Sequence, residues 1–103
     1  MVKKINTEEF RAMDKAGVQV IDFNATWCGP CKMLAPVLEE LSEDLEGKAS
    51  FFAVDTDENP ELAQEFRITS IPAVAVIKDG TLADMHVGFV PKSQMLEFVQ
   101  KYL

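Results

Sequence analysis

The sequence predicts an α/β domain with a central mixed β-sheet and helices on both of its faces. Strand-like and helix-like segments alternate along most of the chain, which is typical of parallel strands joined by helices. The segment Val18–Phe23 is apolar at nearly every position, as expected for a central strand covered on both faces. Two later strand-like segments are separated only by Asp79-Gly80, a tight hairpin turn that makes one pair of strands antiparallel.

The first elements follow from local signals along the N-terminal half. Residues Val2–Ile5 form a short strand candidate. Asn6 is a suitable N-cap with acidic residues in the turn after it, so a helix is expected through about Lys15. A periodic apolar pattern after the central strand predicts a long helix from about Cys28 to Glu46, with Gly47 as its C-cap.

The middle of the chain continues this alternation. Pro36 lies inside the long helix and removes a backbone donor, so we expect a kink there. The next strand covers Ala49–Val54, which completes a βαβ unit with parallel strands. Asn59 is a cap residue, and Pro60 is favourable at a first helical position, so a short helix is expected to Phe66.

Two strands and one helix complete the C-terminal part. The strands cover Ala73–Lys78 and, after the hairpin turn, Thr81–Val87. The last helix is expected from about Lys92 to the final residue, because apolar side chains recur there at helical spacing. Its apolar face contains Met95, Leu96, Val99, Tyr102 and Leu103.

Length and charge limit the classes of function. A chain of 103 residues is expected to form one domain, residues 1–103, with a core that needs no metal and no structural disulfide. A net charge of −7 argues against nucleic acid and anionic membranes as partners. No apolar signal segment follows Met1 and no apolar run approaches membrane-spanning length, so the cytoplasm is the expected location. Nothing indicates an obligate oligomer, and a monomer is expected.

Both cysteines lie in one short motif, Trp27-Cys28-Gly29-Pro30-Cys31-Lys32. The motif follows a strand and opens a helix, where unpaired N–H groups and the helix dipole favour a thiolate. Two thiols at this spacing can close a small disulfide and reopen it. A zinc site is the alternative, but zinc takes four ligands, and two cysteines with one histidine do not complete such a set.

The spacing assigns a different role to each cysteine. Cys28 is the candidate nucleophile, because it stands at the N-terminus of the helix. Cys31 lies one turn further on the same face, so it can attack the Cys28 sulfur and resolve a mixed disulfide. Gly29 allows a substrate backbone to approach closely, and Pro30 fixes φ at a position where its missing donor would be unpaired. Both residues can equally be read as shaping a turn.

Asp22 interrupts the apolar central strand just before the motif. Alternation places its side chain on the opposite face from Ile21 and Phe23. Burial at the end of the strand would raise its pKa, and the carboxylate could then accept the Cys31 proton through a water molecule. The alternative is an exposed acid at the end of a strand, which is the common case for aspartate.

The motif resembles the active-site loop of the thioredoxin family, and three more features match at the expected distances. Asp22 lies six positions before Cys28, an Ile71-Pro72 step follows, and Gly88 stands near the end. The resemblance covers essentially the whole chain. It implies a thioredoxin fold and a dithiol–disulfide oxidoreductase that reduces protein disulfides. It also implies that a thioredoxin reductase recharges the protein, and that the disulfide itself replaces any cofactor.

The same resemblance implies a substrate-binding surface. In the family the bond before Pro72 is cis and faces the cysteine pair, and its backbone pairs with an extended substrate peptide. The residues that would form an apolar rim around Cys28 are Trp27, Ile71, Pro72, Val87, Gly88 and Phe89. For Trp27 and Phe89 taken alone, core packing is the competing interpretation, and a proline that merely starts a strand is the commoner case.

The chain departs from the family pattern at Asn24, Ala53 and Ala73. Asn24 replaces an aromatic residue, which should loosen or rewet the packing beneath the loop. Ala53 replaces a lysine that neighbours the buried acid in many members, so the pKa of Asp22 should be higher here. His86, the only histidine, is interpreted as a surface residue and not as a base for a cysteine.

Two other functions compete with the disulfide reductase. One keeps the fold and reverses the direction, giving an oxidant or isomerase; Gly29-Pro30 between the cysteines and the missing signal segment argue against it. The other is a non-catalytic binding module that holds a partner in the groove around Pro72. The intact Cys28–Cys31 pair argues against loss of activity, although both roles can coexist.

Overall fold

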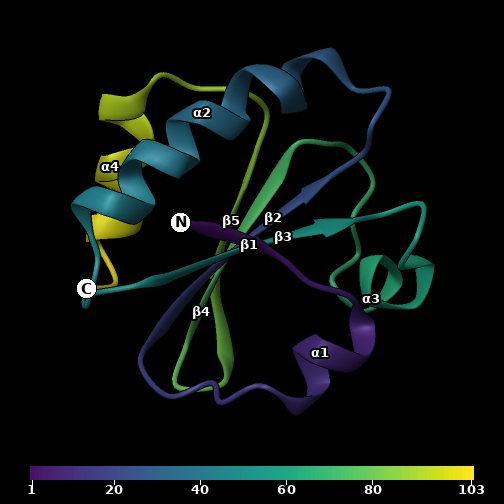
Figure 1. The fold of residues 1–103 in the computed structure, drawn as a ribbon, viewed down its shortest axis with the longest axis horizontal. Helices are drawn as coiled ribbons and strands as arrows, with labels where there is room; N and C mark the ends of the chain where they lie inside the picture. The colour runs from purple at the N-terminus through teal and green to yellow at the C-terminus, as the bar shows by residue number, and fades with distance from the viewer.

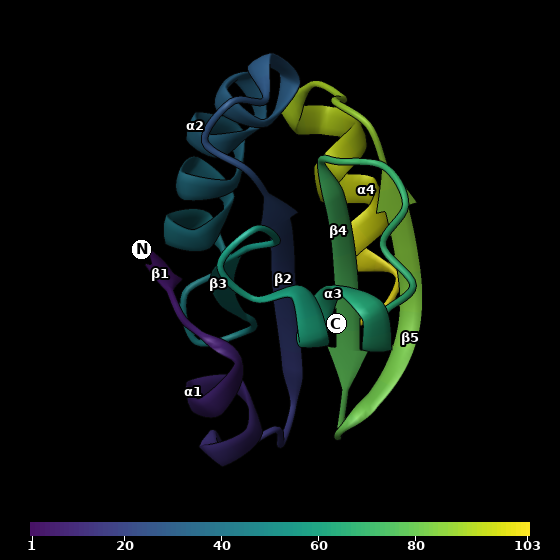
Figure 2. The ribbon, with the colours of Figure 1, turned by 90° about the vertical axis from the view of Figure 1, so that its right-hand side faces the viewer.

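Five strands form one mixed sheet in the order β1-β3-β2-β4-β5 in the computed structural model, which describes residues 1–103. β3 runs parallel to both β1 and β2, whereas β4 is antiparallel to β2 and to β5. Figure 2 shows β2 and β4 in the middle of the sheet and β5 at one edge. The strands are β1 (Val2–Lys4), β2 (Val18–Asn24), β3 (Ser50–Asp55), β4 (Ala73–Lys78) and β5 (Thr81–Val87).

Four helices cover the two faces of the sheet, α2 and α4 on one and α1 and α3 on the other (Figure 1). They are α1 (Thr7–Ala12), α2 (Gly29–Asp44), α3 (Pro60–Glu65) and α4 (Lys92–Gln100). The predicted class, the order of elements and the antiparallel hairpin are therefore confirmed. No helix has the length and apolar character needed to cross a membrane.

β2 is buried on both faces, and its side chains alternate between the two hydrophobic clusters of the core. Val18 and Val20 pack into the cluster beneath α2 and α4, whereas Ile21 and Phe23 pack into the cluster beneath α1 and α3. Successive side chains of a strand point to opposite faces. Asp22 therefore lies on the same face as Val20, under α2. Its position on the opposite face from Ile21 and Phe23 is as the sequence predicted.

Three helix ends differ from the sequence-based expectation, and one of them is the end of α4, which stops at Gln100 and not at the final residue. α1 ends at Ala12 and not near Lys15, because Met13 has an extended backbone and the Asp14 carboxylate accepts a bond from the Ala16 N–H. This local bond of an aspartate competes with continuation of the helix.

The long helix α2 also ends early, at Asp44 with Leu45 as its C-cap, two residues before the expected end. Gly47 lies in the turn after the helix with φ +83°. Glycine reaches this region without strain, so Gly47 redirects the chain toward β3 although it is not the cap residue itself.

Two further details were not foreseen. Asn59 precedes α3 but makes no capping bond; its side chain instead accepts bonds from the backbone N–H and the hydroxyl of Thr7. Asn59 therefore joins the starts of α1 and α3. In α4, Phe98 is buried together with Met95 and Val99, whereas Leu103 is exposed.

Candidate active site

The two cysteines are joined in a disulfide at the start of α2. Cys28 is the N-cap residue, and its sulfur accepts the backbone N–H of Cys31 at 3.2 Å. An N-cap side chain accepts from the second or third helical residue. Pro30 occupies the second position and has no N–H, so Cys31 supplies the only such donor. The helix end therefore directs one N–H group and its dipole at the Cys28 sulfur.

Asp22 lies beneath this helix and is only 3% exposed. Burial raises its pKa to about 6, and a hydrogen bond from Asn24 opposes that rise. The Asn24 amide donates to Oδ2 at 3.3 Å, while Oδ1 is buried without a partner. The expectation of a buried acid with a raised pKa is confirmed, and the exposed alternative is wrong.

A cavity of about 220 Å³ opens beside Cys31. Asn24 and Ala53, the two departures from the family pattern, both border it. This agrees with the expectation that Asn24 loosens or rewets the packing beneath the loop. The full lining is Lys4, Asn24, Ala25, Thr26, Cys31, Lys32, Ala35, Ala53 and Asp55.

On the opposite side, Cys28 faces the loop before β4. Its sulfur lies 3.9 Å from the Ile71 carbonyl oxygen. The Ile71–Pro72 bond is cis, and the Pro72 carbonyl accepts the Gly88 N–H at 2.8 Å. Ile71 makes no backbone–backbone hydrogen bond, so its N–H and C=O are available to an extended peptide.

The predicted rim contains both exposed and half-buried residues. Trp27 is 70% exposed and Val87 is 55% exposed, so core packing of Trp27 is excluded. Gly88 and Phe89 are half-buried, whereas Pro72 is buried. The structure therefore leaves large apolar side chains in solvent around Cys28, which is typical of a docking surface.

Sequence reasoning missed a hollow of about 170 Å³ next to this rim. It lies between Trp27 and the segment before Pro72, and its lining is Trp27, Thr56, Ile68, Thr69, Ser70 and Ile71. The indole N–H of Trp27 donates to the Asp57 carboxylate at 2.8 Å, which holds the ring over this region. Trp27 and Ile71 were predicted as rim residues, but no local pattern marks the other four, because the lining comes from three separate loops.

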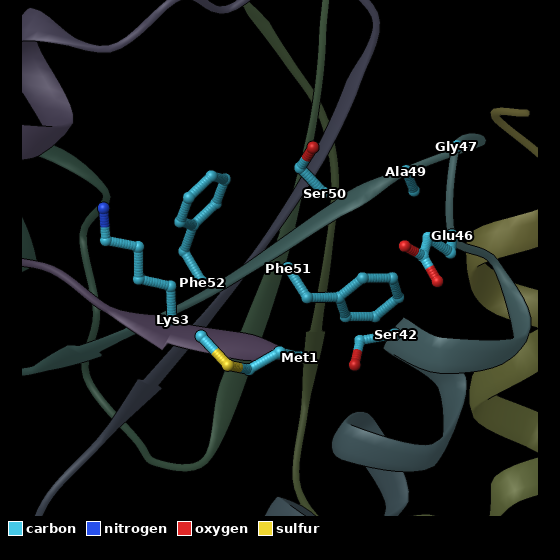
Figure 3. Close-up of a pocket in the computed structure, with 9 residues that line it drawn as sticks. All are labelled: Met1, Lys3, Ser42, Glu46, Gly47, Ala49, Ser50, Phe51 and Phe52. Atoms are coloured by element: carbon cyan, nitrogen blue, oxygen red, sulfur yellow. The ribbon is translucent and has the colours of Figure 1, made fainter.

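The largest hollow, about 520 Å³, lies elsewhere (Figure 3). Residues from β1, the start of β3 and the end of α2 border it. α2 has 16 residues, so this hollow is separated from the disulfide by a helix of about 24 Å. It contains none of the predicted site residues.

His86 corrects one expectation. It is half-buried against the Phe98 ring, with centroids 5.5 Å apart, and its Nε2 is buried without a partner. It is therefore not a surface residue, although it makes no hydrogen bond to either cysteine. No group of three or more histidine, cysteine or acidic side chains is arranged to hold a metal ion.

Comparison with known proteins decides the family. A family model described as Thioredoxin matches residues 1–101. The chain belongs to the thioredoxin family. Thioredoxins of Staphylococcus aureus strains Mu50 and MW2 are each 49% identical over 102 residues, which cover 99% of this chain and 98% of theirs. The crystal structure of chloroplastic thioredoxin z superimposes with a TM-score of 0.88 at 35% identity, covering 98% of this chain and 93% of that one.

Membership confirms the thioredoxin fold and the chemistry of the motif. The protein is a dithiol–disulfide oxidoreductase, and Cys28–Cys31 is its redox-active pair. The usual partners of a thioredoxin are proteins that contain disulfides and a thioredoxin reductase.

Proposed function

We propose that this thioredoxin reduces protein disulfides in two exchange steps. The Cys28 thiolate attacks one sulfur of the substrate disulfide, which forms a mixed disulfide and releases the other sulfur as a thiolate. Cys31 then loses its proton and attacks the Cys28 sulfur. The Cys28–Cys31 bond forms, the bond to the substrate breaks, and the substrate leaves fully reduced. The observation that carries this assignment is the position of Cys28 as N-cap of α2.

Asp22 is the proton acceptor in the second step. Its carboxylate lies under α2, on the face of the sheet that Cys31 covers, and its pKa of about 6 suits a base near neutral pH. Gly29 and Pro30 keep the turn between the cysteines narrow and exposed, so that a substrate can reach Cys28.

The substrate binds across the rim. An extended peptide pairs with the free backbone groups of Ile71, as in strand addition to an edge. Its apolar side chains contact Trp27 and Val87, with Pro72, Gly88 and Phe89 completing the surface. Backbone pairing and broad apolar contact give little preference for sequence, which suits a reductase with many protein substrates.

The cellular setting follows from the family. A thioredoxin reductase returns the oxidised pair to the dithiol, and no cofactor beyond the pair itself is required. We further propose that residues 1–103 act as a single monomeric domain in the cytoplasm, without a membrane or nucleic-acid partner. The use of both cysteines for one redox pair supports a reducing compartment, where structural disulfides are rare.

The reduction potential tests the direction of the reaction. The protein is equilibrated in thiol redox buffers, and the oxidised fraction of the pair is measured by alkylation and mass. A potential near or below the cytosolic glutathione poise, roughly −220 mV, is expected. A value well above it would make the protein an oxidant or isomerase, and no reversible pair at all would leave only the binding module.

Two matched variants test the roles of the cysteines. Cys31→Ser should accumulate a stable mixed disulfide with a protein substrate, since nothing then resolves it. Cys28→Ser should form none. The reverse pattern would exchange the two roles.

A further inference from the structure

The active site has two separate openings, and each cysteine lies at a different one. The hollow beside Trp27 and Ile71 lies on the side where Cys28 faces the rim. The cavity beside Cys31 is bordered by β1, β3 and the first turns of α2, and it shares no lining residue with that hollow. A substrate that covers the rim therefore leaves the second opening free.

The buried carboxylate adjoins this second opening. Asp22 and Ala53 are register partners across β2 and β3, so their side chains share one face of the sheet. Asn24 lies two residues further along β2 and thus on the same face. Both Ala53 and Asn24 border the cavity, which places the Asp22 carboxylate directly behind its wall.

The cavity suits water. At about 220 Å³ it has room for several molecules of about 30 Å³ each. Residues with polar side chains border it from three strands, namely Lys4 of β1, Asn24 of β2 and Asp55 of β3. Oδ1 of Asp22, buried without a protein partner, is the atom that a water molecule would satisfy.

Resting on the proposed role of Asp22, we propose that Asn24 is a positioning residue for the resolving step. Its amide holds Oδ2 of Asp22, and this leaves Oδ1 to receive the Cys31 proton through water in the cavity. The asparagine also opens that cavity, so the proton leaves on the side away from the bound substrate.

The proposed step is balanced. The Cys31 proton passes through water to Oδ1, and the Cys31 thiolate attacks the Cys28 sulfur. The Cys28–Cys31 bond forms while the bond to the substrate sulfur breaks. The substrate thiolate takes a proton from solvent, and Asp22 later returns its own proton to the cavity water.

Other ionisable groups around the cavity do not replace this contact. They are Lys4 of β1, Cys31 and Lys32 of α2, and Asp55 of β3. The β4 partner of Asp22 is Val74, which carries no charge. None of them bonds the Asp22 side chain, and Lys4 pairs instead with Glu58 at 3.1 Å. Asn24 is thus the only protein group that donates to this carboxylate.

Stopped-flow kinetics with an aromatic disulfide tests the proposal. Release of the first aromatic thiol reports attack by Cys28, and release of the second reports resolution by Cys31. Both phases are measured from pH 5 to pH 9. Asn24→Leu keeps the number and branching of the side-chain heavy atoms and removes the donor. Asn24→Ser removes the amide in a smaller side chain, and Gln94→Leu removes an exposed amide elsewhere as the control.

We expect Asn24→Leu to move the pH midpoint of the second phase upward by about one unit, because a hydrogen bond to the ionised carboxylate is lost. The second phase then slows about tenfold at pH 5, while the first phase is unchanged. Asn24→Ser should move this midpoint in the same direction, and Gln94→Leu should leave it unchanged. A ¹³C titration of the Asp22 carboxyl in folded protein should move by the same amount.

The controls separate this inference from the function beneath it. Asp22→Asn should slow the second phase and remove its pH midpoint. If it does so, but the Asn24 variants have the same pH profile as the parent protein, the positioning role of Asn24 is wrong and the proposed function stands. If Asp22→Asn resolves as fast as the parent, the proposed role of Asp22 fails together with this inference. Equal shifts in both phases would also overturn it, since a positioning residue of the second step leaves the first unchanged.

Discussion

The indole N–H of Trp27 donates a 2.8 Å hydrogen bond to the Asp57 carboxylate, and this bond holds a largely exposed aromatic ring next to Cys28. An exposed tryptophan without such a bond would sample several rotamers and lose entropy when a substrate docks. The pair therefore preorganises the rim, although the two residues are 30 positions apart in the chain.

Asp57→Ala should weaken the reduction of a protein disulfide, because the Trp27 ring loses its anchor. We expect kcat/KM for insulin to fall about threefold, as an exposed bond to a charged group is worth about 0.5–1 kcal/mol. Turnover of a small aromatic disulfide, which does not need the rim, should be unchanged. Glu43→Ala, on the exposed outer face of α2, is the control. Equal losses with both substrates would contradict a role in docking.

Asp22→Asn should stabilise the oxidised protein at neutral pH. The folded-state pKa is about 6 against 3.8 in the reference, so between these values the folded state binds more protons than the unfolded state. The contribution of Asp22 to the free energy of unfolding is therefore fully present below pH 3.8 and is lost as the pH rises through 6. Removing the charge should add up to about 3 kcal/mol at pH 8 and little at pH 4.

Urea unfolding of both proteins at pH 4 and pH 8 measures this difference. Glu97→Gln, an exposed acid on α4, should show no comparable gain. A gain for Asp22→Asn that is the same at both pH values would have to come from packing and not from ionisation.

Pro30→Ser should raise the reduction potential. Proline withholds an N–H at the second position of α2, where a donor would point at the Cys28 sulfur. Serine restores that donor and stabilises the thiolate of the reduced form. One such bond, about 1.4 kcal/mol, corresponds to about 30 mV, measured in thiol redox buffers.

Pro36→Ala provides the matched control, because it restores an N–H in the same helix beyond the reach of Cys28. Its effect should fall equally on the oxidised and reduced forms and leave the potential unchanged. If both variants shift the potential alike, helix stability and not the donor to Cys28 controls it.

Asn59→Ala should destabilise the fold by about 2–3 kcal/mol. The Asn59 side chain is buried and accepts from the Thr7 N–H at 2.8 Å, so its loss leaves a buried donor without a partner. Thermal or urea unfolding measures the change. Gln64→Ala on the exposed side of α3 should change the free energy of unfolding by less than about 0.5 kcal/mol. A similar loss of stability in both variants would contradict a stabilising role for the bond between Thr7 and Asn59.

Local patterns predicted the elements well because each signal lies within a few residues. The apolar run of β2, the Asp79-Gly80 turn and the spacing of Cys28 and Cys31 all act over one strand, one turn or one helical turn. The end of α1 was predicted less well. There the Asp14 side chain competes with the helix for a backbone donor, and propensity does not indicate which bond wins.

By itself, the sequence determined the class of the fold, the redox pair and the acid beneath it, because spacing and alternation place these residues without long-range contacts. Only the tertiary structure decided which loops meet around the pair. Segments far apart in the chain border both the hollow beside Trp27 and the cavity at Asn24. The tertiary structure also leaves the backbone of Ile71 without a backbone partner. The geometry of these features depends on how the sheet and helices pack, and no local pattern records it.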